Sequence, residues 1–269
     1  MTKVLTLGAG VQWFEAYAAA QRYNRIVVGG ISLRGSVGAA GGWLQGGGHS
    51  PLSPNYGLGK QDLPWLFQSH SIIFIGVDNV LEITIVTADG NHVIANPYRN
   101  KDLFWALRGG GGGTWGVVTS VTYKTHPSTP FYAGHIFVNS TNANSTLKLF
   151  SEIIRLTPSL VTQGYGGFSS ASIQTLELLV LSPNVSAEQN NATFLPLFEF
   201  AHSLPGLSVE NATIPFQDWW EFNSLLARDG QVGVANEISS WLLPKDVVQT
   251  DKPEDLAQQL LKISGLEYL

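Results

Sequence analysis

The segment 37–50 constrains the fold more than any other part of the sequence. It reads V-G-A-A-G-G-W-L-Q-G-G-G-H-S and holds six glycines in fourteen positions. Other groups can approach such a backbone closely, and its turns leave N–H groups that suit phosphate oxygens. A second glycine segment, 109–113, follows a short amphipathic stretch and precedes a β-branched run. Together the two segments indicate an extended, phosphate-bearing ligand, which requires that they lie side by side in the fold.

Composition and charge restrict the partners of the chain. Its 269 residues are 44% hydrophobic, which supports a globular protein of one large domain or two ordinary ones. A formal net charge of -5 without a basic run argues against nucleic acid, because phosphate-backbone binding depends on clustered Lys and Arg. The longest apolar window, 71–77, is too short to span a bilayer, so we expect no membrane partner.

Thiol chemistry and metal binding are not expected. The sequence has no cysteine, which excludes disulfides, thiolate nucleophiles and Cys-bound metal. His49, His70 and His92 lie in separate segments without helical pairing, so they do not suggest a metal site.

Five Asn-x-Ser/Thr sequons indicate a secreted glycoprotein. They begin at Asn139, Asn144, Asn184, Asn191 and Asn211, all in polar, loop-like surroundings. The apolar stretch in the first ten residues is too short for a signal peptide. We therefore expect secretion, with no leader in this chain.

Periodicity predicts alternating strands and helices. We expect strands at 4–7, 25–28, 81–87, 92–95, 116–123 and 175–181. We expect helices around 13–20, 102–108 and 145–156. The Asp89-Gly90 pair between two alternating runs predicts a hairpin. Glycine becomes rarer after His126-Pro127, which places a domain boundary near 127–131.

Several stretches of the sequence resemble one known family. They read G-A-G-V-Q-W, S-V-G-A-A-G-G-W-L-Q-G-G-G-H-S-P-L-S, Y-G-L-G, D-N-V-L-E-I-T-I-V-T-A-D-G and N-K-D-L-F-W-A-L-R-G-G-G-G-G-T-W-G-V-V-T-S-V-T-Y-K-T-H-P. They are similar to the flavin-binding domain of secreted fungal FAD-linked oxidases of the berberine-bridge-enzyme group, within the vanillyl-alcohol-oxidase type. The resemblance implies an α+β fold, with an incomplete PCMH-type FAD-binding domain at 1–130 and part of an α+β substrate-binding domain at 131–269.

The resemblance also implies which residues contact FAD. In the family, the first glycine loop and the strand after the second one give backbone contacts to the pyrophosphate, ribityl and adenine portions. The matching positions here are Val37, Gly38, Gly41, Gly42, Gly46, Gly47, Gly48, His49, Asp78, Asn79, Gly116, Val117 and Val118.

Two departures from the family bear on activity. Family members carry an upstream subdomain with a histidine that links covalently to flavin, and some add a cysteine near the position of 34–36; this chain shows neither. Family members also continue beyond the position of Leu269 with the rest of the substrate domain, which often carries the proposed catalytic tyrosine. We therefore expect FAD to bind non-covalently at best, weakly or not at all, without turnover, and we name no catalytic residue.

A third departure is internal. In the family, Y-G-L-G runs almost directly into D-N-V-L, whereas 60–76 intervene here. The hypothesis is a translated, unspliced intron, since removing 60–76 restores Y-G-L-G-V-D-N-V-L. A genuine surface loop is the alternative.

The resemblance implies an FAD-dependent oxidase of an alcohol, a sugar or a secondary metabolite, with a small-molecule substrate and molecular oxygen as partners. A non-catalytic product of a damaged or mis-spliced gene is the alternative function.

Overall fold

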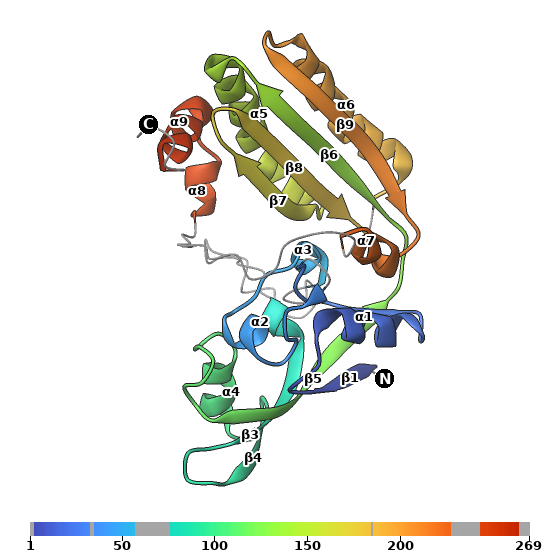
Figure 1. The fold of residues 1–269 in the computed structure, drawn as a ribbon, viewed down its shortest axis with the longest axis vertical. Coiled ribbons are helices and arrows are strands. Elements are labelled where there is room, and N and C mark those ends of the chain that lie inside the picture. Colours follow the sequence, from blue (N-terminus) through green and yellow to red (C-terminus); the bar gives the residue numbers. More distant parts are fainter. Residues whose placement is uncertain (1–2, 33–34, 57–75, 184, 227–242, 264–269) are drawn as a thin grey trace. The chain divides into compact units, whose positions relative to one another are not determined.

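The computed structural model describes residues 3–32, 35–56, 76–183, 185–226 and 243–263. Within these ranges the chain divides into two compact units, which are described separately (Figure 1). The first unit holds 3–32, 35–56, 76–130 and 217–226, and the second holds 131–183, 185–216 and 243–263. Both units combine helices with an antiparallel sheet, which confirms the α+β class.

The first unit is built on a five-stranded sheet. Its strands are β1 (Val4–Gly8), β2 (Arg25–Val27), β3 (Val80–Val86), β4 (His92–Ala95) and β5 (Val117–Pro127). The order is β1-β5-β3-β4, and β2 also pairs with β5. β5 is therefore the organising strand, and its alternation places Val121 and Tyr123 in the core. The predicted hairpin is confirmed, because β3 and β4 pair antiparallel with Gly90 at a positive φ of 82° in the turn.

Short helices complete the first unit. They are α1 (Trp13–Gln21), α2 (Gly42–Gln45), α3 (Ser53–Tyr56), the 3-10 turn η3 (Gly76–Asn79), α4 (Lys101–Leu107) and α7 (Trp219–Leu226). In α1 the residues Trp13, Ala16, Tyr17 and Ala20 are buried, the spacing of one helical face. The Trp13 indole stacks on Tyr17, with ring centroids 5.4 Å apart, and meets the edge of Trp43 at 4.9 Å. This aromatic core joins α1 to the first glycine segment.

The second unit is a four-stranded sheet with helices on one face. Its strands are β6 (Phe131–Ser140), β7 (Gly166–Ala171), β8 (Thr175–Ser182) and β9 (Leu207–Phe216), in the order β7-β8-β6-β9. The long helices α5 (Ala143–Thr162) and α6 (Ala187–Ser203) cover the same face (Figure 1). α8 (Lys245–Val248) and α9 (Pro253–Ile263) follow and pack against α5.

Close packing between α6 and the sheet explains one glycine of β6. A β-carbon at Gly134 would lie 2.5 Å from the ring of Phe194, so any larger residue would displace α6. Ile136, Val138, Leu149 and Phe194 then form a single apolar layer. Among the described helices, none combines the length and apolar character that a membrane crossing needs.

Candidate functional site

The two glycine segments meet in the structure. Gly47 has φ of 81° and Gly109 has φ of 121°, backbone conformations that favour glycine. A β-carbon on Gly109 would lie 3.5 Å from the Cα of Gly47, so the two backbones are in contact. The Gly111 N–H also donates to the carbonyl of Gln45 at 2.8 Å. Segments far apart in the sequence therefore form one glycine-lined junction, as a shared ligand requires.

Some glycines of this junction are required by internal packing. A β-carbon at Gly48 would lie 2.3 Å from the Trp43 indole, and one at Gly46 would lie 2.8 Å from the carbonyl oxygen of Gly42. At Gly116 a β-carbon would lie 2.3 Å from the Val86 carbonyl oxygen, and φ is 141°. These positions need glycine in the folded chain whether or not a ligand binds.

Other glycines have no packing reason. Around Gly38, Gly41 and Gly42 no described atom lies within 4 Å of the position of a β-carbon. None of the three has a positive φ. Because neither crowding nor a positive φ requires glycine at Gly38 and Gly42, they mark the part of the junction that a bound molecule can approach closely.

The first glycine segment is anchored from the core side. The Tyr123 hydroxyl of β5 donates to the Ala39 carbonyl, and the Trp43 indole N–H donates to the His49 carbonyl at 3.1 Å. Backbone bonds add to this, since Trp13 N–H donates to Val37 O at 3.0 Å. The segment is therefore fixed before any ligand arrives. No sequence pattern indicates the anchoring role of Tyr123 or Trp43.

The remaining residues expected at the site lie at η3 and at the start of β5. Asp78 is half-buried and Asn79 is buried in η3, which packs against β3 and β5. In β5, Val118 is buried and Val117 is 71% exposed. The side chain of His49 is exposed. β5, the strand that follows the second glycine segment, thus connects η3 to the first glycine segment.

His126, a residue not expected at the site, contacts both η3 and α3. His126 Nε2 lies 2.8 Å from Asn79 Oδ1, and its ring centroid lies 4.4 Å from that of Tyr56 in α3. Burial lowers the pKa of His126 to about 4, and the positive charges of Lys124 and Arg25 add to this effect. The imidazole is therefore neutral near neutral pH. Tyr56 and His126 both lie in stretches that resemble the family. These stretches are far apart in the sequence, so residue spacing does not predict their contact.

Buried polar atoms without partners concentrate in the first unit. Among the described residues they include Gln45 Oε1, Asn79 Nδ2 and Arg108 Nε, whereas in the second unit Ser151 Oγ is the one described case. Each such atom costs about 1–3 kcal/mol when left unpaired. Gln45 lies within the first glycine segment, and Arg108, stacked on Phe104 at 4.5 Å, precedes the second. Polar atoms of Gln45 and Arg108 that have no partner among the described residues therefore lie in or next to the two glycine segments.

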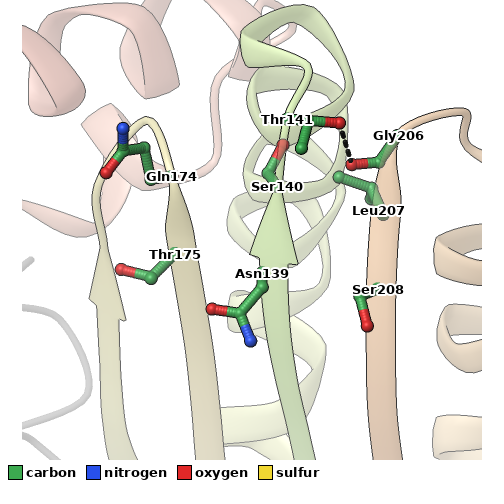
Figure 2. Close-up of a pocket in the computed structure, with 8 residues that line it drawn as sticks. All are labelled: Asn139, Ser140, Thr141, Gln174, Thr175, Gly206, Leu207 and Ser208. Carbon is green, nitrogen blue, oxygen red and sulfur yellow. Dashed lines mark hydrogen bonds between the residues drawn. The ribbon is translucent and has the colours of Figure 1, made fainter.

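The second unit has a separate surface hollow of about 510 Å³. Figure 2 shows that the ends of β6, β8 and β9 and the turns beside them line it with short polar side chains. Thr141 Oγ1 donates to the Gly206 carbonyl at 3.1 Å across one side. The hollow is lined by Asn139, Ser140, Thr141, Gln174, Thr175, Gly206, Leu207 and Ser208. None of the residues expected to contact the cofactor lines it. Among the described residues, no group of three or more His, Cys, Asp or Glu side chains is arranged to hold a metal ion.

Comparisons with known proteins agree with this arrangement. The chain is 34% identical over 264 residues to an uncharacterised FAD-linked oxidoreductase of Arthroderma benhamiae, a match covering 96% of this chain and 43% of that protein. It is 34% identical over 249 residues to the FAD-linked oxidoreductase ffsJ of Aspergillus flavipes, covering 92% of this chain and 37% of the relative. The chain therefore spans less than half the length of these curated relatives. No protein-family model matches it.

A solved structure shares the fold. The VAO-type flavoprotein MtVAO615 of Myceliophthora thermophila C1 superimposes with a TM-score of 0.77 at 26% identity, covering 99% of this chain and 48% of that one. The fold and the glycine junction define a VAO-type flavoprotein. Within that class, the sequence relatives of the chain are named FAD-linked oxidoreductases, which confirms the family expected from its motifs.

Proposed function

We propose that the first unit binds one FAD molecule non-covalently at the glycine junction, as the cofactor-binding part of an FAD-dependent oxidoreductase. The contact between Gly47 and Gly109 carries this proposal. It brings together two glycine segments in which internal packing explains only some of the glycines. The names of the curated relatives support FAD as the ligand. FAD supplies the group that accepts a hydride from a substrate.

The residues at the junction suit the parts of FAD in different ways. Gly38, Gly41 and Gly42 leave room for the pyrophosphate to approach the backbone, whose N–H groups are donors to phosphate oxygens. Gln45 and Asn79 offer an amide oxygen and an amide nitrogen, respectively, that have no partner in the described part of the chain. Because the chain has no cysteine, a cysteinyl link to the flavin is chemically impossible, and we propose that binding is weak and reversible.

The wider function rests on the class of protein. We propose that 131–269 form part of a substrate-binding domain, and that the whole protein oxidises an alcohol, sugar or secondary metabolite with oxygen as electron acceptor. The FAD-linked oxidoreductases among the relatives support the reaction type. We propose that this chain alone does not turn over substrate.

We further propose that the protein is a secreted glycoprotein. Of its sequon asparagines, Asn139, Asn144, Asn191 and Asn211 lie in the described part of the chain. They stand in β6, α5, α6 and β9 rather than in the expected loops, and all four side chains are exposed. Expression through a yeast secretory pathway and digestion with an endoglycosidase tests this. A mass decrease on digestion is expected, and secretion without any glycan contradicts the proposal.

Titration of FAD with the purified chain tests the cofactor assignment. We expect saturable quenching of flavin fluorescence, with competition by ADP and little response to riboflavin, because the glycine junction is assigned to the phosphates. Free flavin that elutes quantitatively from the denatured complex supports reversible binding. Unchanged fluorescence across micromolar protein concentrations refutes the assignment.

A further inference from the structure

Three side chains from separate segments of the first unit contact one another. His126 from β5, Asn79 from η3 and Tyr56 from α3 are joined by the 2.8 Å contact between Nε2 and Oδ1 and by the ring contact at 4.4 Å. His126 is 9% exposed and Asn79 is 1% exposed. His126 and Asn79 are therefore buried, Tyr56 is half-buried, and the imidazole is contacted on two sides.

The hydrogen bond determines the orientation of the Asn79 carboxamide. A carboxamide oxygen only accepts, so the imidazole Nε2–H is the donor. The Nδ2 amino group then carries two hydrogens and no partner, although it is buried. A buried donor with no acceptor among the described residues can donate to an acceptor atom of a bound ligand.

We infer that His126 is a positioning residue that holds Asn79 with its Nδ2 amino group as a donor to an acceptor oxygen of bound FAD. This inference rests on the proposed function. The Tyr56 ring limits rotation of the imidazole, and the imidazole fixes which end of the carboxamide faces the ligand. His126 itself does not touch FAD; it acts through Asn79.

Two substitutions of His126 separate donation from packing. His126→Gln keeps an N–H donor near the position of Nε2, whereas His126→Met fills similar volume without a donor. We expect the Met variant to bind FAD about tenfold more weakly than the wild type, equivalent to ~1.4 kcal/mol. The Gln variant should remain within about threefold of the wild type.

A double-mutant cycle with Asn79→Ala shows whether His126 acts through Asn79. We expect Asn79→Ala to weaken FAD binding and His126→Met to add no further loss in that background. If His126→Met leaves affinity unchanged, or costs as much without Asn79 as with it, the inference is wrong while the proposed function stands. If the wild-type chain does not bind FAD, both are overturned.

An NMR measurement makes the test independent of variant stability. The side-chain amide resonances of Asn79 are assigned as the pair missing from Asn79→Ala, or by sequential assignment of the wild type. Binding of FAD should shift them, with the His126 nitrogen shifts reporting a protonated Nε2. Saturation with FAD that leaves the Asn79 amide pair unshifted overturns the inference and leaves the proposed function intact.

Discussion

Substitution of Gly42 by Leu should separate stability from cofactor binding. Gly42 is the first residue of α2, its φ is not positive, and no described atom lies within 4 Å of a β-carbon there. A β-carbon there therefore meets no clash with the described residues, and replacing glycine restricts the unfolded chain, which stabilises the folded state by roughly 0.4–1 kcal/mol. We expect the free energy of unfolding to stay the same or to rise by up to that amount.

The same side chain occupies the space assigned to FAD. Loss of close backbone approach should weaken FAD binding at least about tenfold, or ~1.4 kcal/mol. Flavin fluorescence titration measures the affinity, and urea denaturation measures the stability. The matched control is Gly10→Leu, since Gly10 is also open and lies outside the junction. If Gly42→Leu binds FAD as tightly as the control, the open glycines do not face the cofactor.

Three further predictions concern the first unit. Because the folded pKa of His126, about 4, lies below the ordinary value of 6.5, the unfolded chain binds more protons between these values. The free energy of unfolding should therefore fall by up to about 3 kcal/mol as pH decreases from 6.5 to 4. Urea denaturation should show a smaller decrease over this pH range for His126→Gln, and the same decrease in both proteins contradicts the reasoning. Trp43→Ala removes a side chain that is 9% exposed and packs on Trp13, so unfolding free energy should decrease by about 3–5 kcal/mol; a loss below about 1 kcal/mol in urea denaturation refutes the anchoring role. Deletion of 60–76 should leave the circular dichroism spectrum and the thermal midpoint near those of the full chain, because Tyr56 and Asn79 at its flanks already meet at His126; a molten product shows that the segment is structural.

Local patterns predicted much of the first unit. The strands, the hairpin at Asp89-Gly90 and helix α4 follow from alternation, turn chemistry and helical spacing, within a few residues of the expected bounds. The insertion at 60–76 lies outside the described residues apart from Gly76, and Asn184 lies outside them too. β5 extends to Pro127, beyond the expected end, because its last residues pair with β2.

Other features depend on contacts that a sequence does not display. Glycine in a loop looks the same whether it makes room for an indole, as at Gly48, or leaves space open, as at Gly42. Trp43 is 9% exposed, whereas Trp105 is 75% exposed and Trp115 is 41% exposed, although all three stand in or beside a glycine segment. Burial of an aromatic residue is set by which distant elements cover it, and only the fold supplies that information.

The return of α7 to the first unit has a consequence for synthesis on the ribosome. Tyr17 packs against Trp219 with ring centroids 5.7 Å apart, and Gln21 Nε2 donates to Asp218 Oδ2 at 2.6 Å. Folding of domains during translation starts from the amino terminus. Here α1 is synthesised early, whereas its partner α7 emerges only after β6 to β9. Until then, other parts of the nascent chain must cover the aromatic face of α1.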